Sequence, residues 1–298
     1  MSARRIRICE VGLRDGLQNE QRSLAASVRI RLAQQLLEAG HQHLEVGAFV
    51  REDRIPQMAG TADVLQGLQG LAGRFTVLVP NSVGWRAALA AGARSIAVFA
   101  AASESFSQRN TNGTIDDVVG RAREVAAHAN AAGVVLRGYV STVTHCPFEG
   151  RVNAAQVVRV AEALLDMGCE EISLGETTGR ALPRDVHELL HACQAALPFN
   201  RLAFHAHDTY GMAVANVVAA LERGIESFDA SLGGLGGCPF APGAAGNIAT
   251  EDLLFLLHGL GCETGIDADR ALRVAFAAEQ ELGRQLPGRV LATRRSKN

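Results

Sequence analysis

One arrangement of apolar and polar residues recurs along this chain. A run with helical character ends in a glycine, and a short apolar run typical of a buried strand begins shortly afterwards. Each of these glycines suits the left-handed backbone conformation that commonly ends a helix: Gly40, Gly92, Gly133, Gly168 and Gly224. The pattern therefore predicts helices and strands in alternation along the chain.

Eight short apolar runs are predicted as strands, each followed by a predicted helix: residues 5–11, 44–46, 75–79, 96–99, 134–136, 172–174, 201–205 and 225–228. Strands that are apolar throughout are covered on both faces, as in a parallel sheet. Eight such units at roughly 30-residue spacing favour a single (β/α)8 TIM barrel over the alternative, a doubly wound open sheet. Residues 268–283 predict one extra C-terminal helix, and residues 294–298 predict a frayed tail.

Composition limits the classes of protein that remain. The 298 residues are 48% hydrophobic and contain no Pro- or Ser-rich linker, so we predict one catalytic domain over residues 1–298. The formal net charge of -2 gives no global basic excess for nucleic acid, and no apolar stretch is long enough for a membrane span. The first residues lack a secretory signal, and the six cysteines form no CxxC pair, which favours a cytoplasmic location.

Polar residues gather where the predicted strands end, which is where the active sites of such barrels lie. They lie at or just after the ends of the first, second, sixth, seventh and eighth strands: Arg14 and Asp15, then Glu45, then Glu176, then His205 and His207, and finally Cys238 with Asn247. Together they supply carboxylates, imidazoles, a thiol, an amide and a guanidinium. This set is typical of metal-assisted chemistry on an oxygen-rich substrate.

His205 and His207 are two residues apart, so on an extended strand both side chains project to the same face. Both can then bind one cation; the alternative is one core histidine and one surface histidine. Asp15 and Asn247 would add oxygen ligands, and a mixed nitrogen and oxygen set suits Mg²⁺ or Mn²⁺ better than a closed zinc site. The spacing therefore favours a divalent-cation site.

Two further side chains are open to a structural and a chemical interpretation. Arg14 can pair with Glu45 or Asp15, or its planar guanidinium can hold a carbonyl that becomes an enolate; we favour the second. Glu45 then anchors Arg14 rather than lying at the surface. Cys238 alone among the cysteines lies in a Gly-rich loop, which predicts a mobile lid that carries a thiol to the site.

The motifs at these positions resemble one known family. Residues 14–20 (RDGLQNE), 99–104 (FAAASE), 137–141 (RGYVS), 205–211 (HAHDTYG) and 236–241 (GGCPFA), with Gly246 and Asn247, carry the resemblance, which covers nearly the whole chain. The chain is similar to the 3-hydroxy-3-methylglutaryl-CoA lyases, in the barrel superfamily of metal-dependent acyl-CoA lyases and carboligases. The first and last motifs are specific to the lyases, and the His-x-His strand is shared with synthases and aldolases.

The resemblance implies a role for each candidate residue. The implied ligands of the divalent cation, Mg²⁺ or Mn²⁺, are Asp15, His205, His207 and Asn247. Arg14 would stabilise the enolate, Cys238 would transfer a proton, and His205 or Asp15 would be the base. Contacts to the acyl-CoA substrate are expected from Arg14, Gln18, Glu45 and Glu176. The implied reaction releases acetyl-CoA and acetoacetate, and a homodimer or higher homo-oligomer is expected.

The chain departs from the family pattern near the expected substrate. Leu13 replaces a proline, Ala48 replaces a hydroxyl-bearing residue, residues 50–54 (VREDR) form a different loop, and Glu176 replaces an aspartate. These changes leave open a related 3-hydroxy acyl-CoA as the substrate. A citramalate- or isopropylmalate-type carboligase is the nearest alternative enzyme. A non-catalytic acyl-CoA-binding barrel is disfavoured by the retained Arg14, Cys238 and four candidate ligands.

Overall fold

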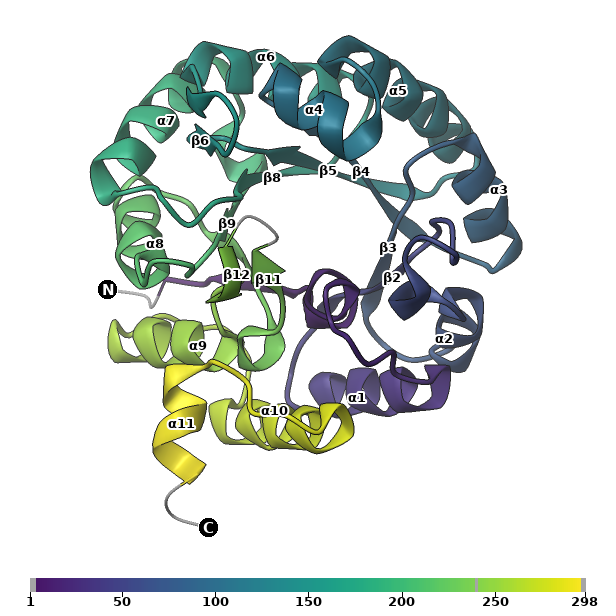
Figure 1. The fold of residues 1–298 in the computed structure, drawn as a ribbon, viewed down its shortest axis with the longest axis vertical. Helices are drawn as coiled ribbons and strands as arrows, with labels where there is room; N and C mark the ends of the chain where they lie inside the picture. The colour runs from purple at the N-terminus through teal and green to yellow at the C-terminus, as the bar shows by residue number, and fades with distance from the viewer. Residues whose placement is uncertain (1–3, 239–240, 296–298) are drawn as a thin grey trace.

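Eight parallel strands close into a barrel in the computed structural model (Figure 1). The structure describes residues 4–238 and 241–295; for residue 238 and residues 241–245 it describes the backbone alone. The strand order around the barrel is β1-β10-β9-β8-β5-β4-β3-β2. Because β1 pairs with both β10 and β2, the sheet is closed, which confirms the barrel and excludes the open sheet. The eight predicted runs supply these strands: β1 (Arg7–Glu10), β2 (His43–Ala48), β3 (Arg74–Leu78), β4 (Ser95–Ala101), β5 (Val135–Ser141), β8 (Glu171–Glu176), β9 (Leu202–Ala206) and β10 (Ser227–Ala230).

Helices form a ring outside the strands (Figure 1). All five glycines expected to end helices have positive φ, between 66° at Gly133 and 104° at Gly40, as predicted. The ring consists of α1 (Ala26–Glu38), α2 (Thr61–Gly67), α3 (Ser82–Ala90), α4 (Glu104–Thr111), α5 (Ile115–Ala131), α6 (Ala154–Asp166), α7 (Pro183–Ala196), α8 (Ala213–Glu222) and α9 (Thr250–Gly259). Among the described residues, no helix combines the length and apolarity that a membrane crossing requires.

The C-terminal region contains two extra helices rather than the one predicted. α10 (Ala268–Leu282) is the expected helix and ends at Gly283, whose φ is 69°. α11 (Arg289–Arg295) follows where a frayed tail was predicted. The prediction of a frayed tail from residue 294 is therefore wrong for residues 294 and 295, which belong to α11. Arg295 pairs with Glu279 on α10 and donates to the Leu286 carbonyl at 2.6 Å.

Two small antiparallel pairs lie outside the barrel sheet: β6 (His145–Cys146) with β7 (Gly150–Arg151), and β11 (Gly237–Cys238) with β12 (Ala241–Ala245). The second pair occupies the Gly-rich segment that was expected to be a mobile lid. In Figure 1 it lies beside the opening of the barrel, close to the turn that follows β1. The segment therefore has regular backbone pairing at the position where a lid was predicted.

The two faces of the strands bury different chemistry. Outward residues pack under the helices and are apolar, as Leu44, Phe204 and Phe228 illustrate. Most TIM barrels fill the interior with branched apolar residues. Here the interior holds buried charged and polar side chains that hydrogen-bond across it, among them Glu45, Arg137, Tyr139, Ser173, His205 and Asp229. The interior of this barrel therefore contains a buried network of polar side chains, where most TIM barrels have hydrophobic packing.

Candidate active site

The turn after β1 presents Arg14 and Asp15 at the carboxyl end of the barrel. Residues Gly12–Gly16 form a single wide helical turn, a feature often found at functional sites. The buried side chain of Glu10 holds this turn in place. Its carboxylate accepts N–H groups from Gly12 at 2.7 Å and Leu232 at 2.8 Å, and the Thr250 hydroxyl at 2.6 Å. Burial raises the pKa of Glu10 to about 7.

Three of the four predicted cation ligands form one cluster. The ligand atoms of Asp15, His205 and His207 all lie within 4.8 Å of one another. The two imidazoles face each other, with their Nε2 atoms 3.1 Å apart, as the spacing on an extended strand predicted. Asn247 adjoins the cluster, because its Nδ2 donates to Asp15 Oδ2 at 2.9 Å. The structure therefore brings all four residues together from three separate parts of the chain.

The electrostatics of the cluster suit a divalent cation. Burial opposes ionisation of Asp15, but Arg14 and the two histidines outweigh it and lower the pKa of Asp15 to about 2. Burial, together with His205, lowers the pKa of His207 to about 4. An ionised carboxylate and a neutral imidazole are the forms that bind metal. The side-chain oxygen of Asn247 is also buried without a hydrogen-bond partner among the described residues. The residues present fit a bound cation.

Arg14 joins the cluster to a second buried carboxylate. Its Nη1 donates to Asp15 at 2.6 Å and its Nη2 donates to Glu45 at 2.8 Å, so the expected contact between Glu45 and Arg14 is present. Burial disfavours the charged form of Arg14, but the two carboxylates more than compensate and raise its pKa. The Tyr139 hydroxyl donates to Glu45 at 2.9 Å. The guanidinium is thus held at a fixed place beside the cluster.

A cavity of about 550 Å³ opens beside these groups. Its wall includes the cluster, Arg14 and the predicted substrate contact Gln18. From there it extends along α4 and α5, where Phe106, Asn110 and Arg121 line it. One end of the cavity is therefore strongly polar, and its length provides room for a ligand larger than the reacting groups alone.

Glu176, a predicted substrate contact, is not among the described residues that line this cavity. It is the last residue of β8 and lies on the same strand face as Ile172 and Leu174, away from the barrel interior. Its Oε1 accepts the hydroxyls of Thr178 at 2.9 Å and Thr144 at 3.3 Å, and burial raises its pKa. Side chains alternate along a strand, so a position directly at the end of a strand can point away from the site.

The loop after β2 meets the cavity through apolar side chains. Val50 and Ile55 line the cavity, whereas Arg51 and Arg54 are exposed. Arg51 is also paired with Asp53. Among the described residues, the part of this loop that meets the cavity is therefore apolar.

Cys238 is placed only by its backbone, because its side chain lies outside the described residues. It is the second residue of β11, directly after Gly237, which lines the cavity. The hairpin backbone therefore passes the cavity at this position.

Three buried side chains below the cluster have no role that the sequence alone predicted. Asp229 lies 3.2 Å from Nδ1 of His205, and Arg137 binds Asp229 through its Nη2 at 2.6 Å. Tyr139 binds Glu45 from the same strand as Arg137. Arg137 and Tyr139 are two residues apart on a strand, and Asp229 directly follows the predicted strand at residues 225–228. Polar side chains at alternate positions of a buried strand were the available signal.

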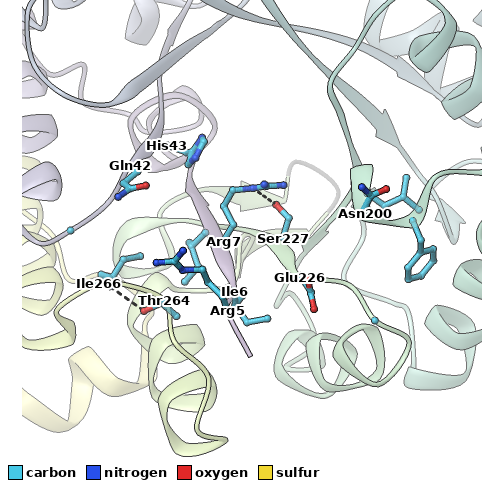
Figure 2. Close-up of a pocket in the computed structure, with 16 residues that line it drawn as sticks. Arg5, Ile6, Arg7, Gln42, His43, Asn200, Glu226, Ser227, Thr264 and Ile266 are labelled. Carbon is cyan, nitrogen blue, oxygen red and sulfur yellow. Dashed lines mark hydrogen bonds between the residues drawn. The ribbon is translucent and has the colours of Figure 1, made fainter. Parts of the chain in front are cut away.

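A larger cavity, of about 730 Å³, lies at the amino end of the barrel (Figure 2). Arg5, Arg7, His43 and Ser227 line it. Arg7 is already engaged there, because it donates to Ser227 at 3.2 Å and pairs with Glu171. The cluster of carboxylate and imidazoles found among the described residues lies at the other end of the barrel, so we assign the active site to the smaller cavity.

Comparison with known proteins identifies the family. Residues 5–276 match the HMGL-like family. The chain belongs to the HMGL-like family. An HMGL-like relative, the hydroxymethylglutaryl-CoA lyase of Pseudomonas mevalonii, is 48% identical and covers 97% of each chain. The mitochondrial hydroxymethylglutaryl-CoA lyase of Bos taurus is 45% identical over 96% of this chain and 89% of its own length.

Solved structures of HMGL-like proteins have the same fold. The crystal structure of hydroxymethylglutaryl-CoA lyase from Pseudomonas aeruginosa superposes with a TM-score of 0.97, at 44% identity and with all of both chains covered. An HMG-CoA lyase from Acinetobacter baumannii in complex with coenzyme A and 3-methylmalate gives a TM-score of 0.90 at 33% identity, covering 96% of this chain and 94% of the other. The resemblance seen in the motifs therefore extends over the whole barrel.

Proposed function

We propose that this HMGL-like protein is a hydroxymethylglutaryl-CoA lyase, which cleaves 3-hydroxy-3-methylglutaryl-CoA to acetyl-CoA and acetoacetate. The observation that carries the proposal is the cluster of Asp15, His205 and His207 beside the Arg14 guanidinium, on the wall of one cavity. Relatives that bear this name match nearly the full chain at 45–48% identity. The cluster supplies the means of binding a metal, and Arg14 supplies a fixed positive charge next to it.

The cation that we propose for the cluster is Mg²⁺ or Mn²⁺. Asp15, His205, His207 and the side-chain oxygen of Asn247 would hold it, and a set of nitrogen and oxygen donors without thiolate is suited to these ions. When bound, the cation would lower the pKa of the tertiary hydroxyl of the substrate. The protein's part is to place these donors at the polar end of the cavity.

Bond cleavage then requires a base, a stabilised enolate and an acid. Both candidate bases, His205 and Asp15, lie on the cavity wall beside Arg14. Removal of the hydroxyl proton lets the carbon-carbon bond break, with its electrons passing to the thioester as an enolate. The Arg14 guanidinium would stabilise that negative charge. We propose that Cys238, carried by β11 past the cavity, then delivers a proton to give acetyl-CoA.

An acyl-CoA thioester is the substrate class that we propose. The solved relative from Acinetobacter baumannii contains coenzyme A with 3-methylmalate, and its fold matches this chain closely. The cavity of this chain combines the polar cluster with apolar walls from Val50, Ile55 and Phe106. Such a lining suits a small polar head joined to a longer, less polar arm.

The test is an assay of the purified protein with 3-hydroxy-3-methylglutaryl-CoA and Mg²⁺ or Mn²⁺. We expect equal release of acetyl-CoA and acetoacetate, and kcat/KM lower by roughly 10- to 200-fold for thioesters that differ by one methylene. A bulkier homologue that ranks far above the methylglutaryl thioester would retain the lyase class and change the substrate. Failure to cleave any member of the series, with metal bound, would contradict the lyase proposal.

A carboligase of the citramalate or isopropylmalate type would form a carbon-carbon bond and not break one, so it is tested by an assay of condensation. That activity would condense acetyl-CoA with a 2-keto acid, releasing coenzyme A, and a thiol reagent would report it. We expect no such release from this protein.

We further infer a cytoplasmic homo-oligomer. The described cysteines Cys9, Cys146, Cys169, Cys193 and Cys262 are all free thiols, which accords with a reducing compartment. Phe255, on α9, is 74% exposed, and Leu260, at the end of the same helix, is 56% exposed. Exposed apolar side chains of this size support self-association. Light scattering of the purified protein measures the oligomeric state directly.

A further inference from the structure

A chain of hydrogen bonds runs beneath the metal cluster, inside the barrel. His205 Nδ1 lies 3.2 Å from Asp229 Oδ2. Asp229 also accepts the Ser173 hydroxyl at 2.7 Å and Arg137 Nη2 at 2.6 Å. Asp229 is 1% exposed, so these protein groups, rather than bulk solvent, define its surroundings. The chain ends on the same imidazole whose Nε2 faces His207.

The contacts of Asp229 fix the direction of its bond to His205. An arginine guanidinium has only donors, so the carboxylate is the acceptor toward Arg137. A carboxylate engaged by arginine and a hydroxyl is an acceptor toward the imidazole as well. The proton on His205 must therefore sit on Nδ1, which leaves the lone pair of the ring on Nε2.

We infer that Asp229 is a positioning residue that fixes the tautomer and the ring orientation of His205, so that Nε2 is presented to the cation. The inference rests on the cation binding within the proposed function. A carboxylate behind a ligating histidine holds the ring in place and increases its strength as a ligand. Asp229 touches neither the substrate nor the cation position; it acts through His205.

Arg137 also supports the part of the site that contains Arg14. Its Nε donates to Glu171 at 2.9 Å, and its Nη1 donates to the Tyr139 hydroxyl, which in turn binds Glu45. Glu45 holds Arg14. One buried guanidinium therefore anchors His205 through Asp229 and Arg14 through Tyr139 and Glu45, so the two halves of the site share one support.

The competing explanation is that Asp229 serves only as the counter-charge of Arg137. Both explanations predict a loss of stability when Asp229 is changed, so stability does not separate them. They differ at His205: a counter-charge leaves the imidazole free to adopt either tautomer, and a positioning residue does not. The tautomer and the affinity for a cation are therefore the informative measurements.

Asp229→Asn tests the inference without changing the size of the side chain. An amide that keeps its oxygen toward Arg137 must turn its NH₂ group toward His205, which forces the imidazole proton onto Nε2. We expect the Kd for Mn²⁺, measured by electron paramagnetic resonance, to rise about 10-fold or more. ¹⁵N NMR of histidine-labelled, metal-free protein, at a pH where the imidazole is neutral, should show His205 change from the Nδ1–H to the Nε2–H form.

Ser95→Ala is the matched control, because it also removes a buried hydrogen bond inside the barrel, to Thr76 at 2.9 Å. Among the described residues, Ser95 forms no hydrogen bond with Asp229 or with the cluster. Its Mn²⁺ affinity and the His205 tautomer should equal those of the wild type. An Asp229→Asn protein with unchanged Mn²⁺ affinity and tautomer would overturn the inference.

The wild-type spectrum gives a second test, which does not depend on whether the variant folds. Finding His205 in the Nε2–H form in the metal-free wild-type protein would also overturn the inference. Neither measurement uses the lyase reaction. Inactivity toward every thioester, with the Nδ1–H tautomer and Mn²⁺ binding intact, would therefore contradict the proposed function alone.

Discussion

At the scale of single residues, the side chains of the candidate site hold one another in place. Arg14 is held between Asp15 and Glu45, and His205 between His207 and Asp229. Each of these side chains has little freedom to lose when a substrate arrives. Groups fixed in this way stabilise developing charge more effectively than groups that must first reorient. Single substitutions here should therefore alter chemistry more than folding.

Replacing His207 by alanine should weaken Mn²⁺ binding about 10-fold or more, because it removes one of the clustered nitrogen atoms. Isothermal titration calorimetry gives the affinity, and chelation followed by added Mg²⁺ or Mn²⁺ should abolish and then restore activity. His43→Ala, which changes a half-buried histidine at the opposite end of the barrel, serves as the control. Equal Mn²⁺ affinity in His207→Ala and wild type would refute the cation site.

Arg14→Lys should lower kcat/KM about 100-fold while Mn²⁺ affinity is retained. The lysine keeps the charge, but a single ammonium cannot bridge Asp15 and Glu45 with the two ends of a planar fork. Steady-state kinetics provide the measurement. Arg86→Lys, at an exposed position of α3, is the control. Wild-type kinetics in the Arg14 variant would mean that charge alone is sufficient there.

At the scale of elements, strand ends and strand alternation together decide which residues meet. The hydrophobic pattern located all eight strands, and hence the end of the barrel at which Arg14, Asp15, His205 and His207 gather. It does not indicate to which side Glu176 points, because the end of a strand alone does not fix the face on which a side chain lies. It also missed α11, which Glu279 on α10 contacts through Arg295 and Asp252 on α9 contacts through the N–H groups of Arg289 and Val290.

The β11–β12 hairpin carries the next prediction. Cys238→Ala should lower kcat by about two orders of magnitude, the scale of a lost proton-transfer group, with Mn²⁺ affinity unchanged. The basis is the passage of the β11 backbone along the cavity at Gly237, together with the family resemblance. Cys262→Ala removes a half-buried thiol elsewhere and should have normal turnover. Full activity of Cys238→Ala would make this thiol dispensable.

At the scale of the whole molecule, two carboxyl groups under the site are buried with raised pKa values. Burial raises the pKa of Glu251 to about 8 and that of Glu10 to about 7. Glu251 accepts the Gly233 N–H at 2.9 Å, in the turn after β10. The folded protein thus keeps protons that the unfolded chain has released near pH 4.5. The stability they contribute is complete below that pH and is lost as pH rises through the folded values.

Glu251→Gln should therefore become progressively more stable relative to the wild type from about pH 4.5 to about pH 8, and the difference should level off at higher pH. The glutamine oxygen can still accept the Gly233 N–H, but the side chain cannot ionise. Thermal denaturation at a series of pH values measures the difference in Tm. Glu162→Gln, at an exposed position of α6, should show a difference that does not vary with pH. The same pH-independent behaviour in Glu251→Gln would refute the raised pKa.

How far the sequence predicts this molecule depends on the range of the contacts. Strands, helices and their glycine ends follow from local patterns, and so does the pair of histidines on one face. Asp229 and Arg137 belong to strands that are distant in sequence, and their roles depend on which side chains meet inside the closed barrel. A charged residue at the end of a buried strand indicates that it has a partner inside the barrel, but the sequence does not identify that partner.

The buried polar chain has a consequence for anyone who redesigns this barrel. It passes from Arg7, on the wall of the cavity in Figure 2, through Glu171, Arg137 and Asp229 to His205. Transferring only the candidate ligands and the loops at the carboxyl end to another eight-stranded scaffold would omit the buried hydrogen bonds that hold those ligands in place. For the same reason, we expect a substitution at Arg7 or Glu171, although it lies at the amino end of the barrel, to disturb Arg137 and through it the position of His205.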